Sequence, residues 1–77
     1  MTLGENLKEK RLQRGLSLRQ LEKEVGINCM TLSSYEKNKI SPSIYMIWDL
    51  ADFFGCSIDE LCGRKESTYE QKENRTN

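Results

Sequence analysis

The sequence has no histidine, a single proline and three cysteines, Cys29, Cys56 and Cys62. A zinc site usually needs four cysteine or histidine ligands, and no CxxC pair occurs, so we expect no metal centre. The cysteines are expected to be reduced thiols packed as small apolar groups. With no histidine, no glycine-rich phosphate loop and no metal ligands, the sequence predicts neither an enzyme nor a bound cofactor or small-molecule ligand.

Long apolar runs are also missing. None approaches the roughly 20 residues of a membrane span, and the start, MTLGENLKEKRL, lacks the apolar stretch and cleavage site of a signal peptide. We therefore expect a cytoplasmic protein without a membrane segment. Apolar residues make up 36% and charged residues 31% of the chain, a balance typical of a small soluble globule rather than a disordered chain.

The net charge is zero, but acids and bases are unevenly placed. Residues 8–39 hold eight basic and four acidic residues, a net charge of +4, whereas residues 49–60 hold four acids and no base. A molecule with one basic side can bind a polyanion there. The charges alone fit two ordinary solvated faces equally well.

Signals for helix starts and stops divide the chain into short helices. Capping-box patterns begin at Thr2, Ser17 and Ser57, Asn28 is a suitable N-cap, and Ser41 before Pro42 fits a cap followed by proline at the first helical position. Residues suited to a left-handed helix end alternate with these starts; they are Gly15, Gly26, Asn38, Gly55 and Gly63. These signals predict an all-α fold with five helices, near 3–14, 18–25, 29–37, 42–54 and 58–62.

Apolar residues recur at helical spacing in each of these segments up to residue 62. Residues 64–77, RKESTYEQKENRTN, contain one aromatic and no aliphatic residue. We therefore expect one domain over residues 1–63, followed by a polar charged tail that is disordered or becomes ordered on dimerisation.

The second and third predicted helices are separated by only Gly26, Ile27 and Asn28, which is typical of a helix-turn-helix. On a helical wheel the third helix turns Leu32, Tyr35 and Glu36 inward. Its opposite face has no acidic side chain, as a surface that approaches phosphates requires. Because a buried carboxylate needs a partner, we expect Glu36 to form a partly buried ion pair with Arg11 of the first helix.

The stretch LSLRQLEKEVGINCMTLSSYEKNKISPSIYMIWDLADFFGCSIDEL resembles the lambda-repressor-like, Cro/C1-type (XRE family) helix-turn-helix domain, and the resemblance extends over about residues 3–62. The positions that carry it stand in one register without a gap: Arg11, Leu16-Ser17, Leu21, Gly26-Ile27, Leu32-Ser33, Tyr35-Glu36, Ser41-Pro42-Ser43, Leu50-Ala51, Phe54-Gly55 and SIDEL at 57–61. The family implies a compact five-helix fold. It also implies a transcriptional regulator, typically a repressor, that binds double-stranded operator DNA as a homodimer with the third helix in the major groove.

The same resemblance implies two sets of DNA contacts. Base contacts would come from Asn28, Cys29, Met30, Ser33 and Ser34. Phosphate contacts would come from Ser17, Lys37, Asn38 and Lys39. The family commonly has glutamine at the position of Leu18, and its phosphate contact would be lost or taken over by Arg19 or Gln20. The family also prefers alanine where this chain has Glu22, which we expect to tilt toward solvent or to pair with a base.

Several alternatives stay open at this level. Trp48 and Phe53 are expected in the core, and the remaining apolar surface near the fifth helix and the tail would form the dimer seam. A rival interpretation is a protein-interaction module of the same fold, antitoxin-like or adaptor, that uses the acidic side of the last two helices and the tail. Cys29 could be a redox switch, although a structural thiol fits better. The sequence fits a phage or mobile-element repressor, a restriction-modification controller and an antitoxin equally well.

Overall fold

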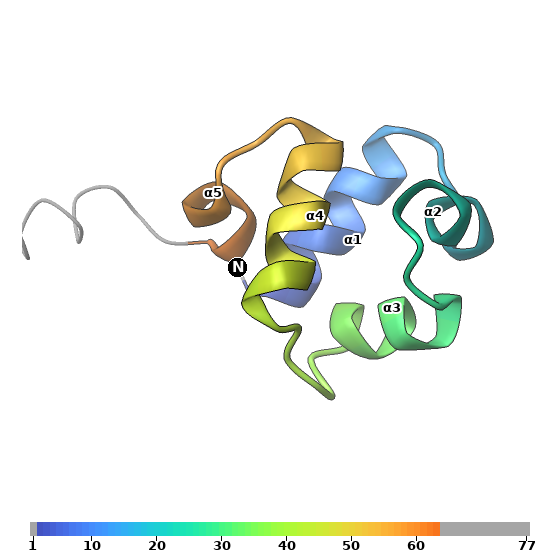
Figure 1. Cartoon of the computed structure of the whole chain (residues 1–77), viewed down its shortest axis with the longest axis horizontal. Helices are drawn as coiled ribbons and strands as arrows, with labels where there is room; N and C mark the ends of the chain where they lie inside the picture. Colours follow the sequence, from blue (N-terminus) through green and yellow to red (C-terminus); the bar gives the residue numbers. More distant parts are fainter. Residues whose placement is uncertain (1, 64–77) are drawn as a thin grey trace, which may run out of the picture.

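The computed structural model describes residues 2–63, which form five α-helices and no strand (Figure 1). The helices are α1 (Leu3–Gln13), α2 (Leu18–Val25), α3 (Cys29–Glu36), α4 (Ile44–Phe54) and α5 (Ile58–Cys62). The predicted all-α, five-helix class is confirmed, and each boundary lies within two residues of its predicted place. The tail predicted at 64–77 lies outside the described residues.

Side-chain caps begin the helices. Thr2 and Ser17 each complete a capping box, in which the hydroxyl accepts a backbone N–H and a glutamate or glutamine side chain reaches back. The predicted start of the fourth helix is wrong. Ser43, not Ser41, is the N-cap: its hydroxyl accepts the N–H of Met46 at 3.3 Å, and α4 begins at Ile44. Pro42 is buried ahead of the cap.

The helices pack as a closed ring of neighbours. α1 packs on α3 and α5, α4 packs on α2 and α5, and α2 packs on α3. Two polar contacts fasten α5 to α1: the amide of Asn6 donates to the carbonyl oxygen of Leu61 at 3.1 Å, and Lys10 pairs with Glu60 at 3.1 Å. The ring arrangement leaves α3 at the edge of the domain, between α1 and α2 (Figure 1).

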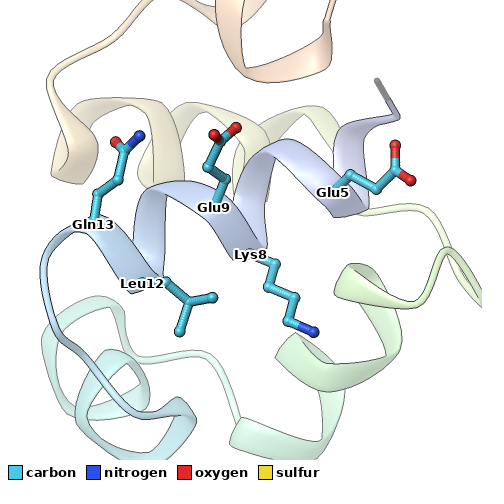
Figure 2. Close-up of a pocket in the computed structure, with 5 residues that line it drawn as sticks. All are labelled: Glu5, Lys8, Glu9, Leu12 and Gln13. Atoms are coloured by element: carbon cyan, nitrogen blue, oxygen red, sulfur yellow. The ribbon is translucent and has the colours of Figure 1, made fainter.

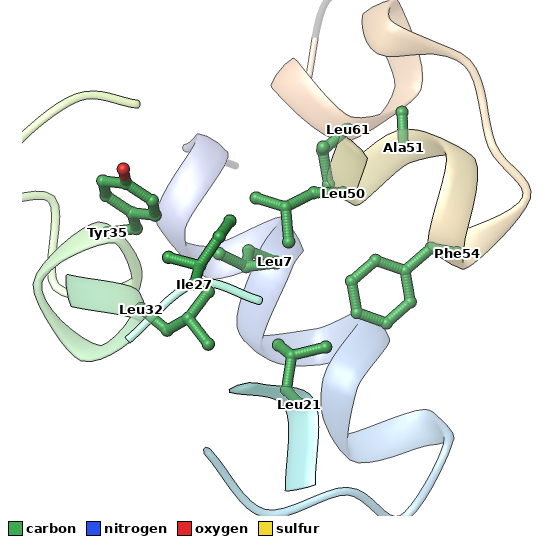
Figure 3. Packing of buried hydrophobic residues seen from close by; sticks show 9 residues of the cluster. All are labelled: Leu7, Leu21, Ile27, Leu32, Tyr35, Leu50, Ala51, Phe54 and Leu61. Carbon is green, nitrogen blue, oxygen red and sulfur yellow. The ribbon is translucent and has the colours of Figure 1, made fainter. Parts of the chain in front are cut away.

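One hydrophobic core lies inside this ring (Figure 3). It draws on every helix and on the α2–α3 turn: Leu7, Leu21, Ile27, Leu32, Tyr35, Leu50, Ala51, Phe54 and Leu61. The expectation that Trp48 belongs to the core is wrong, because 49% of it is exposed. It stands two residues before Leu50, about 160° around α4, so the two side chains leave opposite sides of the helix. Phe53 packs against the core and is half-buried.

No helix within residues 2–63 has the length and apolar character needed to cross a membrane.

Candidate nucleic-acid interface

The turn between α2 and α3 fixes how α3 is presented. Gly26 ends α2 in the left-handed conformation with φ of 76°, a backbone angle that glycine adopts without steric cost. Ile27 follows and is buried in the core, and Asn28 caps α3. Because the middle of the three-residue turn is anchored, the two helices are held as one unit.

The residues expected to contact bases lie on and before the first two turns of α3. Met30 is 76% exposed, Asn28 is exposed, and Cys29, Ser33 and Ser34 are half-buried. Leu32 and Tyr35 point the other way, into the core. α3 therefore presents a surface of small polar side chains with Met30 as its most prominent apolar group. Asn28 Oδ1 is occupied, since it accepts the N–H of Met30 at 2.8 Å.

The start of α2 carries three of the residues expected at phosphates. Ser17 Oγ accepts the N–H of Gln20 at 3.1 Å, and Gln20 Oε1 accepts the N–H of Ser17 at 2.8 Å. The capping box thus uses the oxygens of both side chains, and leaves the Ser17 hydroxyl hydrogen and the Gln20 amide nitrogen as donors. Arg19 is exposed, whereas Leu18 packs against the core.

The loop after α3 carries the other three residues expected at phosphates, Lys37, Asn38 and Lys39. Lys37 and Lys39 are exposed and take part in none of the ion pairs formed within residues 2–63. The side chain of Asn38, by contrast, is already bound to the N-terminus of α1. Its Oδ1 accepts the N–H of Gly4 at 3.1 Å and its Nδ2 donates to Thr2 Oγ1 at 2.9 Å. Of the three residues, the two lysines are the ones free to reach a phosphate.

Arg11 holds Glu36 away from the outer face of α3. Arg11 Nε donates to Glu36 Oε2 at 2.6 Å and Nη2 donates to Oε1 at 3.1 Å, while Nη1 donates to the carbonyl oxygen of Leu16 at 2.8 Å. The two side chains are only 10% and 6% exposed. The one acidic residue of α3 therefore faces the interior.

Glu22 is a residue whose place the sequence interpretation missed. It points neither to solvent alone nor to a base: its Oε1 accepts the N–H of Cys29, the first residue of α3, at 3.2 Å. The reason is the shortage of acceptors at a helix start, where four N–H groups lack intrahelical partners and Asn28 satisfies the one from Met30. An acid near the end of one helix, facing the start of the next across a three-residue turn, is the signal that could have found it.

Cys29, Cys56 and Cys62 are all half-buried. Burial raises the pKa of the Cys56 thiol, and the nearby acid Glu60 adds to this effect while Lys10 and Arg14 oppose it.

A hollow lies on the exposed side of α1 (Figure 2). It is lined by Glu5, Lys8, Glu9, Leu12 and Gln13. All five side chains come from a single helix, with acids and a lysine side by side, and none of them belongs to the predicted contact set.

The sequence pattern of the helix-turn-helix family matches residues 7–61. The chain belongs to the Cro/C1-type helix-turn-helix family. Among solved structures, the "Structure of the S. venezulae BldD DNA-binding domain" superposes with a TM-score of 0.70 at 32% identity, covering 78% of this chain and 90% of that one.

Curated members of the family show the same relationship. The chain is 33% identical over 63 residues to the HTH-type transcriptional regulator PuuR of Escherichia coli, covering 82% of this chain and 34% of that protein. It is 30% identical over 66 residues to the HTH-type transcriptional regulator ImmR of Bacillus subtilis, covering 86% of this chain and 52% of that one. The chain therefore spans between a third and about half of the length of these relatives.

Proposed function

We propose that this chain is a DNA-binding transcriptional regulator that places α3 in the major groove of operator DNA. The observation that carries the proposal is the surface around α3. Its own acid is turned inward, and exposed bases stand at Arg19 in the first turn of α2 and at Lys37 and Lys39 directly after α3. A helix without exposed acids of its own, with basic residues on its partner helix and after its end, suits a groove between two phosphate backbones.

Within this surface the residues take different roles. Met30 would contact a thymine methyl group, and Asn28, Ser33 and Ser34 would exchange hydrogen bonds with base edges. Cys29 lies beside them. Ser17, Arg19, Gln20, Lys37 and Lys39 would contact phosphates, and the Asn38 side chain would do so only by leaving α1. The outer face of α3 lacks the arginine and glutamine that usually read guanine and adenine, so we propose readout helped by DNA shape.

We propose further that two copies bind one operator, because one short helix contacts too few bases to define a site. Apolar side chains exposed on α4 support a contact between the copies. Tyr45 is 70% exposed and packs edge-on against Trp48, with ring centroids 5.9 Å apart, and Ile44 beside them is also exposed. On α5, by comparison, Leu61 is fully buried and Ile58 is half-buried.

Occupancy of an operator in a promoter would exclude polymerase, so we propose that the protein represses transcription. We propose that it does so in the cytoplasm, where DNA and polymerase meet. Selection from a pool of random duplexes tests DNA binding and half-site spacing together. We expect a symmetric motif with half-sites about one helical turn, ~34 Å, apart. Affinity for the selected duplex should fall steeply between roughly 50 and 200 mM salt. A promoter carrying it should lose transcription when the protein is added.

Failure to enrich any duplex would contradict the proposal. It would favour the rival interpretation, a protein-interaction module, for which Asp49 and Asp52 beside Tyr45 on the outer side of α4 would be the working surface. Sedimentation with and without the selected duplex tests the pairing. We expect two chains per duplex, and Tyr45→Ala should weaken the second binding step while Lys8→Ala, on the exposed side of α1, should not. One chain per duplex would overturn the dimer.

A further inference from the structure

The start of α3 is held by two side chains from different places. Asn28, the cap, accepts the N–H of Met30, and Glu22, from α2, accepts the N–H of Cys29. These N–H groups belong to the residues assigned above to base contact. A carboxylate from the neighbouring helix thus sits at the end of α3 that is proposed to face DNA.

Among the described residues, Glu22 forms no ion pair with a base. Two ion pairs form within residues 2–63, Lys10 with Glu60 and Arg11 with Glu36, and neither includes Glu22. Its carboxylate is half-buried and is hydrogen-bonded to the backbone of α3. The positive end of the α3 dipole is the favourable partner that remains for this charge.

A helix start whose N–H groups are unpaired would interact with DNA differently. Unpaired N–H groups and the positive dipole end make a ready binding place for a phosphate. A phosphate contact carries no sequence information, whereas contacts to base edges do. An anion already seated at the start of α3 competes with a phosphate for the same N–H groups.

We propose that Glu22 is a positioning and specificity-determining residue for DNA binding. It fixes the first turn of α3 against α2, and its negative charge keeps the backbone phosphates away from this end of the helix, so that the end meets base edges. Glu22 therefore lowers affinity for every duplex but lowers it most for duplexes without the operator sequence. The specificity half of this inference rests on the proposed function; the positioning half does not.

The positioning half is tested without DNA. Amide hydrogen exchange of the ¹⁵N-labelled full chain is compared between the wild type and three variants, Glu22→Ala, Glu22→Gln and Glu24→Gln. Exchange at the Cys29 amide should accelerate by about tenfold in Glu22→Ala, which removes the acceptor, and less in Glu22→Gln, which keeps one. Glu24→Gln is the matched control, because Glu24 is an exposed acid two residues along the same helix. Unchanged Cys29 exchange in Glu22→Ala would overturn the positioning role.

The specificity half is tested by the ratio of operator affinity to random-duplex affinity. Glu22→Gln should bind random duplex about threefold to tenfold tighter and the operator tighter by less, so that the ratio of operator to random affinity falls. Glu24→Gln removes the same formal charge and should leave the ratio unchanged. Equal ratios in the two glutamine variants would overturn the specificity role.

Thermal melting of each variant separates these effects from unfolding. If the wild type binds no duplex at all, the proposed function fails and the specificity role fails with it. Exchange at Cys29 still decides whether Glu22 positions α3.

Discussion

Arg11 and Glu36 tie α1 to α3 through two parallel hydrogen bonds, and both side chains are almost fully shielded from water. A third donor of the same guanidinium holds the carbonyl oxygen of Leu16, just after α1. The pair therefore fixes two things at once: the placement of α3 against α1 and the path of the chain into α2. It also keeps a carboxylate off the surface that is proposed to meet phosphates.

Removing the Arg11 side chain should lower the stability of the fold. In Arg11→Ala the Glu36 carboxylate remains buried without its partner, and breaking a buried pair in this way typically costs several kcal/mol. We expect the free energy of unfolding to fall by about 3 kcal/mol, measured by urea denaturation. Lys10→Ala is the control, because in the Lys10–Glu60 pair the Glu60 side chain is 59% exposed, and such a pair should be worth at most about 1 kcal/mol. Equal losses in the two variants would contradict a buried pair.

Gly4 marks the closest approach of α1 to the end of α3. A Cβ atom built on Gly4 would lie 2.5 Å from the carbonyl oxygens of Tyr35 and Glu36. Alanine favours helices over glycine by about 1 kcal/mol, so propensity alone predicts that Gly4→Ala stabilises the protein. We expect the opposite sign, a loss of about 2 kcal/mol or more, because backbone atoms must move to make room. A raised melting temperature in Gly4→Ala would contradict this packing.

Asn38 combines a left-handed backbone with two side-chain bonds to α1, at Thr2 and Gly4. Its φ is 59°, which costs alanine roughly 1 kcal/mol and glycine nothing. Asn38→Gly and Asn38→Ala lose the same side-chain bonds, so Asn38→Ala should be the less stable by about 1 kcal/mol in thermal unfolding. Equal stability of the two variants would mean that backbone strain contributes nothing at this position.

Much of this fold follows from local signals in the sequence. Caps such as Thr2 and Ser17, and left-handed stops such as Gly26 and Asn38, act within a few residues, so the helices they bound were predicted closely. The start of α4 was misplaced because Ser41 and Ser43 are equally good caps by local chemistry. Burial of Pro42, a tertiary effect, leaves the cap to Ser43.

The candidate site was harder to predict where side chains act between helices. The pair of Arg11 and Glu36, which the structure contains, was expected from the inward positions of both residues and mainly from the family resemblance. Glu22 and Asn38, however, bind backbone N–H groups of other helices. Such acceptors have no periodicity of their own, since any nearby helix start can supply the donor. Their roles became visible only once the helix ends were placed in space.

Lys37 and Lys39 should contribute to affinity but not to sequence preference. Each is exposed and free of ion pairs within residues 2–63, so each can neutralise a phosphate. Lys37→Ala and Lys39→Ala should each weaken operator and random duplexes alike and flatten the salt dependence of log K by about one. Fluorescence anisotropy over a salt series measures this slope. A change in the selected motif, rather than in the slope, would place these lysines at bases.

Met30 should affect sequence preference instead. It is the most exposed apolar side chain of α3, and a methionine on a groove-facing helix can contact a thymine methyl group. Loss of that contact in Met30→Ala should relax preference at one T·A position by about 1 kcal/mol, with little change in the salt slope. Selection from random duplexes with the two proteins in parallel measures the difference position by position, and Lys37→Ala serves as the control that weakens binding without altering the motif. If the Met30→Ala motif equals that of the wild type, the outer face of α3 does not read the major groove at this residue, and the proposed docking of the helix is wrong.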